Sequence, residues 1–120
     1  MALVAVSRPA DAGAGSSNGV WILGYGGDQS SGIVVGALGP TRRSANESEY
    51  IGCQVWGFPG FRSGYCEALS AAGTYRLCFT GDASLLDVMS TIGPASEITF
   101  EWQDWTTCSF VVVSNGSRSL

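Results

Sequence analysis

The chain has 120 residues and a formal net charge of −4, with 45% hydrophobic and only 13% charged residues. A chain of this length fits one compact domain and buries a sizeable core. All six positive residues are arginine and histidine is absent, so the sequence lacks the basic stripe of a nucleic-acid-binding protein and the commonest catalytic base and metal ligand. No stretch approaches the length of apolar sequence that a membrane span needs. The composition therefore disfavours nucleic-acid partners, membrane spans, metals, cofactors and enzymatic catalysis.

Residues 1–19 are predicted to form an N-terminal arm and linker, followed by a single β-rich domain over residues 20–120. The linker, RPADAGAGSSNG, holds almost nothing to bury, which is typical of flexible connections. Such an arm can add a strand to a neighbouring subunit, or it can fold back as an edge strand of its own sheet. The sequence leaves both arrangements open.

A first hairpin is predicted from residues 20–27 and 32–39 around the turn DQSS, and a polar connection with Arg42 and Arg43 follows it. Residues 50–80 then read as a three-stranded antiparallel meander. Its strands lie near 50–56, 65–69 and 74–79, with GFPG and SAAG as the breaks. A register that places Leu69 opposite Tyr75 also places Tyr65 opposite Phe79. One face of the meander is then almost wholly aromatic and aliphatic, with Glu67 among its residues.

The same register places Cys66 opposite Cys78, at a separation that a disulfide tolerates. Cys53 and Cys108 can then pair with each other if the last strand lies beside the first strand of the meander. Four cysteines allow three pairings, and buried reduced thiols are an equal alternative. No CxxC pair occurs, which argues against zinc. Bonded cysteines would favour an extracellular or virion-associated location.

A short helix is predicted over residues 84–92, capped by Asp82 or Ser84, and a patterned hairpin follows in which Trp102 faces inward. Residues 110–113 are apolar on both faces, which indicates a central strand. The expected fold is mainly β, an antiparallel sandwich or curved sheet of about seven to eight strands with this one helix.

No catalytic, cofactor-binding or metal-ligating constellation emerges from these residues. Serine and cysteine nucleophiles lack an activating histidine, and Glu67 is better explained by a sheet edge or an arginine partner. Two function classes remain. The chain is expected to be a non-enzymatic, self-assembling structural protein, such as a virion, decoration or surface-filament subunit, that forms homo-oligomers through its N-terminal arm and sheet edges.

The alternative is a carbohydrate-binding, lectin-like module that stacks a glycan on Trp56 and Trp105. These two tryptophans stand next to predicted turns, where exposed aromatic rings are expected. Removing residues 1–18 distinguishes the classes, because assembly through the arm would be lost whereas glycan affinity would be kept.

Overall fold

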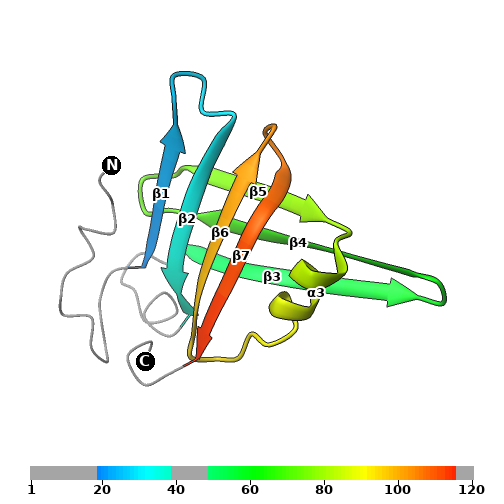
Figure 1. Cartoon of the computed structure of the whole chain (residues 1–120). Helices are drawn as coiled ribbons and strands as arrows, with labels where there is room; N and C mark the ends of the chain where they lie inside the picture. The colour runs from blue at the N-terminus through cyan, green and yellow to red at the C-terminus, as the bar shows by residue number, and fades with distance from the viewer. Residues whose placement is uncertain (1–18, 39–48, 116–120) are drawn as a thin grey trace.

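The computed structural model describes residues 19–38 and 49–115, and it contains seven strands and one short helix in these ranges (Figure 1). The strands are β1 (Val20–Tyr25), β2 (Ser31–Ala37), β3 (Tyr50–Phe58), β4 (Phe61–Leu69), β5 (Tyr75–Thr80), β6 (Ser96–Gln103) and β7 (Thr107–Asn115), and the helix is α3 (Ala83–Met89). The predicted mainly β fold with one short helix is confirmed. Residues 1–18 of the predicted arm and linker, which was assigned to residues 1–19, lie outside the described residues, as does the connection that holds Arg42 and Arg43.

All seven strands belong to one sheet with the order β1-β2-β6-β7-β5-β4-β3. Every neighbouring pair is antiparallel except β5 and β7, which run parallel and share a single register pair, Phe79 with Thr107. The sheet is therefore mixed rather than purely antiparallel. The chain reaches β7 from β5 through α3 and β6, and this route leaves β5 and β7 running in the same direction.

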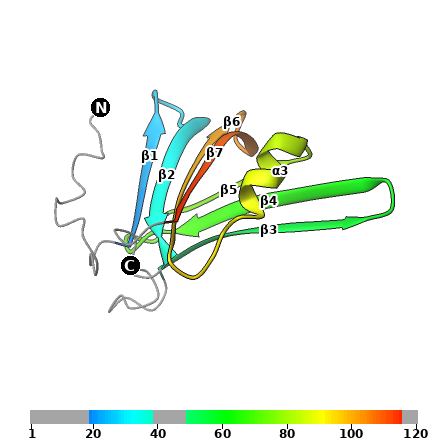
Figure 2. The same cartoon turned by 60° about the horizontal axis from the view of Figure 1, so that its bottom comes forward.

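At the β5/β7 contact the sheet folds over on itself. Figures 1 and 2 show β1, β2, β6 and β7 running side by side, while β3, β4 and β5 cross behind them. We call these groups the four-stranded half and the three-stranded half. Their facing sides enclose the core, as expected when two β layers each bury one side.

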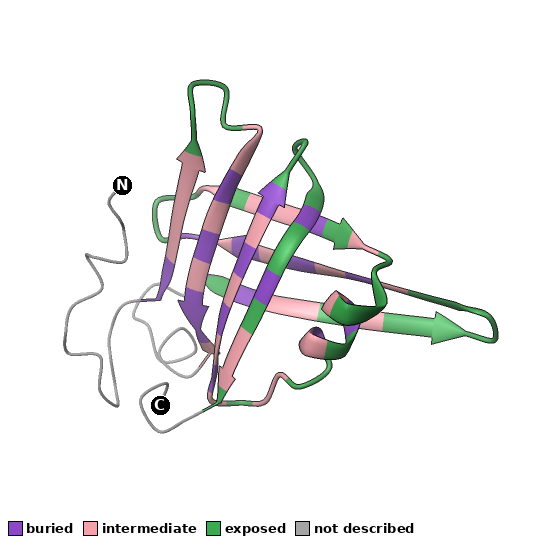
Figure 3. Ribbon diagram, viewed as in Figure 1, coloured by how far each residue is buried: buried purple, intermediate pink, exposed green. Residues whose placement is uncertain are grey.

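The core shows the alternation that β-strands impose, because successive side chains point to opposite faces of a sheet (Figure 3). In the four-stranded half the inward positions Val34, Ile98, Phe100 and Trp102 are fully buried. The inward orientation predicted for Trp102 is confirmed. β7, which holds residues 110–113, is the fourth of the seven strands, as predicted, although these four residues have register partners on β6 alone.

The register predicted for the meander is confirmed: Leu69 pairs with Tyr75 and Tyr65 with Phe79, and Cys66 lies opposite Cys78. The disulfides, however, join Cys53 to Cys66 and Cys78 to Cys108. The considered Cys66–Cys78 and Cys53–Cys108 bridges are wrong. Cys66 lies on the middle strand and opposes cysteines on both sides, Cys53 as well as Cys78, so the register alone did not determine its partner. Two disulfides are compatible with an oxidising, extracellular environment.

Helix α3 covers the inner side of the β3–β4 hairpin and contacts β7. Asp82 caps the helix by accepting a hydrogen bond from the backbone N–H of Leu85 at 3.1 Å. The helix ends at Met89 rather than at residue 92, because the Ser90 hydroxyl bonds back to the carbonyl of Leu86 and the following residues form tighter turns. Its buried side chains, Leu86 and Met89, hold the helix to the sheet.

Candidate functional site

The outward side of the three-stranded half is covered by aromatic rings. We call this surface the aromatic face, and its rings are Tyr50, Trp56, Phe58, Phe61, Tyr65, Tyr75 and Phe79. All except Tyr65 are exposed, with exposed fractions from 39% to 63%. Soluble monomers rarely expose so many large apolar groups in one place, and such patches commonly mark interaction sites.

Five of these rings contact a neighbouring ring on the adjacent strand, in two groups. The Phe58 and Phe61 rings stack with their centroids 5.0 Å apart. Tyr65 lies between Trp56 and Phe79, with centroid distances of 5.9 Å to each. The Tyr65 hydroxyl donates to the side-chain oxygen of Gln54 at 2.8 Å, which fixes the middle ring. Aromatic pairs at these separations stabilise one another, so the face is ordered before any partner binds.

Glu67 is the one charged residue among the outward positions of these three strands. Its carboxylate accepts a hydrogen bond from the Tyr75 hydroxyl at 2.6 Å, so a tyrosine provides the partner that the sequence suggested an arginine or a sheet edge would supply. This hydrogen bond, together with burial, raises the pKa of Tyr75 well above its ordinary value. Burial and the neighbouring Glu67 also raise the pKa of Tyr50. Both hydroxyls stay protonated at neutral pH and screen the carboxylate.

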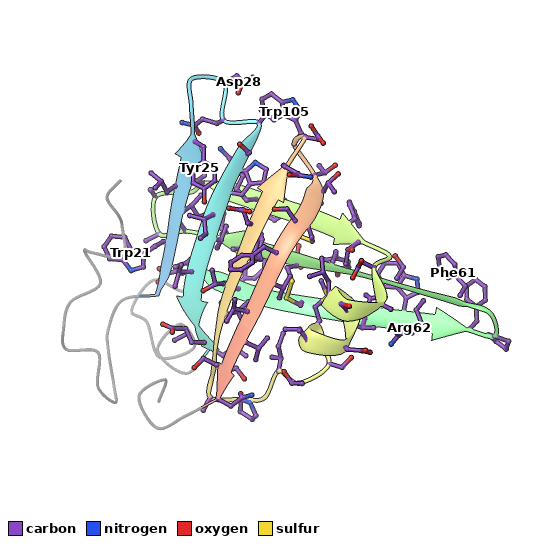
Figure 4. The ribbon with its side chains drawn as sticks, viewed as in Figure 1. Trp21, Tyr25, Asp28, Phe61, Arg62 and Trp105 are labelled. Atoms are coloured by element: carbon purple, nitrogen blue, oxygen red, sulfur yellow. A yellow bond between two sulfur atoms is a disulfide. The ribbon has the colours of Figure 1, made fainter. Side chains whose placement is uncertain are left out.

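The β3–β4 hairpin carries part of the aromatic face beyond the rest of the sheet (Figures 1 and 2). Its two-residue loop, Pro59-Gly60, has the proline and the positive-φ glycine typical of a type II turn, with φ +83° at Gly60. Phe58, beside this loop, is 63% exposed. Figure 4 shows Phe61 and Arg62 at this far end. Trp56 lies within β3, in contact with Tyr65, so it belongs to a packed surface rather than to an isolated stacking platform.

A second candidate lies at the other predicted stacking residue, Trp105. This ring is 60% exposed and lines a cleft of about 490 Å³ between the β1–β2 loop, β5 and the β6–β7 turn. Asp28 also lines this cleft, and Figure 4 shows Asp28 and Trp105 at the same end of the molecule. Trp56 does not line this cleft, so the structure does not bring the two predicted stacking residues into one site.

The described ranges, residues 19–38 and 49–115, hold no candidate metal centre. No group of three or more histidine, cysteine, aspartate or glutamate residues gathers there in a way that could hold a metal ion. All four cysteines are bonded. In the same ranges no helix is both long and apolar enough to cross a bilayer.

Several residues of these two sites were not singled out by the sequence. Gln29 and Arg76 line the cleft, but their sequence separation is 47 and only the fold-over of the sheet brings them together. Phe58 and Phe61 could have been found, because a proline-glycine turn flanked by two aromatic residues predicts a hairpin with paired rings at its tip.

Comparisons with known proteins add no assignment: no protein-family model matches the chain, and no curated protein or solved structure matches it either.

Proposed function

We propose that this chain is a non-enzymatic structural subunit that assembles with copies of itself, as a virion, decoration or surface-filament protein does. The aromatic face carries the proposal. It is ordered, broad and apolar, and the part of the chain that the structure describes leaves it uncovered. Burying large aromatic side chains is the main source of interface stability in protein assemblies.

Charge favours a second copy of this chain as the partner. The chain carries a net charge of −4, so two copies repel each other unless they meet through a neutral surface. The aromatic face comes close to this requirement because Glu67 is its one charged residue, and the Tyr75 hydroxyl donates a hydrogen bond to that carboxylate. In a symmetric contact the same patch lies on both sides, and a nearly uncharged patch avoids like-charge pairs across the interface.

The edges of the sheet support the same function. β1 and β3 are the outermost strands of the described sheet, and neither contains a charged residue or a proline. Natural edge strands that must stay unpaired are usually protected by such residues. A second apolar surface lies on the outward side of β7, where Phe110 and Val112 are 42% and 41% exposed. Apolar surfaces on both halves suit a subunit with neighbours on more than one side.

A charge placed in the aromatic face tests the proposal. Phe79 is 46% exposed and lies on β5 beside Tyr65, so Phe79→Glu places a carboxylate in the proposed interface without opening the core. We expect the intact protein to sediment as an oligomer and Phe79→Glu to shift strongly toward the monomer mass of 12.5 kDa. Ala72→Glu, in the exposed β4–β5 turn, adds the same charge outside the face and should assemble normally.

Circular dichroism of each variant shows whether the fold is kept. A monomeric parent protein at concentrations of about 100 μM, or a Phe79→Glu variant that assembles like Ala72→Glu, would refute assembly through this face.

Carbohydrate binding is a second candidate function, and the cleft beside Trp105 favours it. A sugar ring stacks on an exposed aromatic ring, and polar groups nearby fix its orientation. Trp105 supplies the ring, and Asp28 and Gln29 line the same cleft. Binding of the intact protein to a glycan array, lost in Trp105→Ala and kept in Trp56→Ala, tests this function.

A further inference from the structure

Backbone strain concentrates at the cleft beside Trp105. Among the described residues, three that are not glycine have a positive φ: Gln29 at 57°, Asp104 at 49° and Trp105 at 70°. Gln29 and Trp105 line the cleft, and Asp104 adjoins it in the β6–β7 turn. Each such conformation costs about 1 to 3 kcal/mol, and residues held in this way cluster at binding sites.

Hydrogen bonds hold the strained turn from two sides. The backbone N–H of Trp105 donates to the carbonyl of Ser30 in the β1–β2 loop at 2.8 Å. On the other side, the carbonyl of Thr106 accepts from the N–H of Phe79 on β5, also at 2.8 Å. The exposed Trp105 ring is therefore carried on a fixed backbone, and a ligand that stacks on it meets a pre-organised platform.

Arg76 places a positive charge inside the cleft. Its guanidinium lies over the buried Trp102 ring, 5.2 Å from the ring centroid. It donates to the Tyr75 carbonyl at 2.8 Å and to the Gln29 side-chain oxygen at 3.2 Å. A guanidinium has five N–H donors, so these two bonds leave three.

No described carboxylate forms a salt bridge with Arg76, although the exposed Arg62 has one with Asp87 at 3.1 Å. The guanidinium is half-buried and held in a fixed orientation by the Gln29 side chain and the Trp102 ring. Such a planar group is suited to bind a carboxylate through two parallel hydrogen bonds.

From this arrangement we propose that the cleft binds a saccharide that carries a carboxylate, such as a uronic acid, with its carboxylate on Arg76 and its ring stacked on Trp105. The inference rests on the carbohydrate-binding function proposed above and names its ligand class. Asp28 accepts a hydrogen bond from the backbone N–H of Ser30, which keeps its own carboxylate ionised at the rim. That group accepts hydrogen bonds from sugar hydroxyls and repels anions of higher charge, so a singly charged carboxylate fits better than a phosphate.

Two ligands that differ only in the carboxylate test whether the cleft recognises this charged group. Oligogalacturonides and their carboxyl-reduced forms have the same linkages and differ in the carboxylate, so titration of the intact protein with each measures what the carboxylate adds. We expect the acidic form to bind more tightly by about tenfold or more, as hydrogen bonds between charged groups do. Arg76→Gln should abolish this difference between the two forms, whereas Trp105→Ala should weaken the binding of both.

The outcomes separate this inference from the function on which it rests. If both ligand forms bind equally well, the acidic-sugar inference is wrong and carbohydrate binding stands. If neither form binds and a glycan array gives no signal, both are wrong. Should Arg76→Gln lose the native circular dichroism, Arg76→Lys replaces it. This variant keeps the positive charge but cannot form two parallel hydrogen bonds, and an acidic preference as large as the parent's would overturn the two-bond contact proposed between the carboxylate and Arg76.

Discussion

The Cys78–Cys108 disulfide should contribute more to stability than the Cys53–Cys66 disulfide. It closes a loop with a sequence separation of 30, for which the chain-entropy relation gives about 3.6 kcal/mol. The Cys53–Cys66 bond closes a separation of 13, worth about 2.9 kcal/mol in the same relation. Replacing each pair with alanine should therefore lower the free energy of unfolding by different amounts. Either loss is a large part of the stability of a small domain.

The positions of the two disulfides in the fold should further increase the difference between their contributions to stability. Cys53 and Cys66 lie within the β3–β4 hairpin, whose register pairs run along both strands. Cys78 and Cys108 instead join β5 to β7, which share one register pair, so this disulfide reinforces the strand pairing with the fewest register pairs in the described sheet. Its loss should let the junction open locally. The backbone N–H of Phe79, which donates across the junction to Thr106, reports such opening.

Urea unfolding under oxidising conditions measures both losses, and amide hydrogen exchange measures the local opening. We expect the Cys78→Ala/Cys108→Ala variant to lose about 3 to 4 kcal/mol and to exchange the Phe79 amide faster than global unfolding allows. The Cys53→Ala/Cys66→Ala variant is the matched control and should lose less, with Phe79 exchange still limited by global unfolding. Equal losses in the two variants, together with unchanged exchange at Phe79, would refute the junction argument.

Two further predictions concern the hairpin and the outer face of the four-stranded half. A Cβ added at Gly64 would lie 2.8 Å from a Leu86 side-chain carbon and from a β3 backbone oxygen, so Gly64→Ala should lower the free energy of unfolding in urea by about 1 to 3 kcal/mol. Gly52→Ala is the control, because its added Cβ points into open space and should leave the free energy of unfolding unchanged. Equal effects of the two substitutions would contradict this packing. Burial and a 2.9 Å hydrogen bond to Glu101 raise the pKa of Tyr25 from 10.0 to about 12. Because the protonated form is favoured in the folded state, this contribution to stability is present below pH 10 and is lost as the pH rises toward 12. Tyr25→Phe should remove this loss from a plot of unfolding free energy against pH, and ultraviolet titration of the tyrosines checks the pKa.

Strand pairing was predictable from the sequence because local signals agree. The SAAG turn fixes the distance between two alternating strands, and one register alone aligns Leu69 with Tyr75 and Tyr65 with Phe79. The choice of the buried side was not predictable. Hydrophobicity suggests that the aromatic side of β4 packs inward, yet the small residues on the other side, Gly64 and Ala68, are buried.

The reason is steric. Helix α3 approaches β4 so closely that an added Cβ at Gly64 would meet Leu86, so only small side chains fit beneath the helix. The sequence of β4 is apolar on both sides of the strand, so it does not indicate which side helix α3 covers. The cleft was hidden for a related reason, since its Arg76 and Trp105 come from strands and turns that adjoin only after the sheet folds over.

The four cysteines form a row across β3, β4, β5 and β7, and this row lets a wrong disulfide be corrected inside the folded sheet. The β4–β5 hairpin is local, so the first oxidation can join Cys66 to Cys78, which face each other. A thiolate at Cys53, which faces Cys66 from the other side, can attack the Cys66 sulfur and release Cys78 as a thiolate. Cys78 is then free for Cys108 when a second oxidising equivalent arrives. In these steps the bond moves from one facing pair of cysteines to the next, and each pair already lies in the register of the folded sheet.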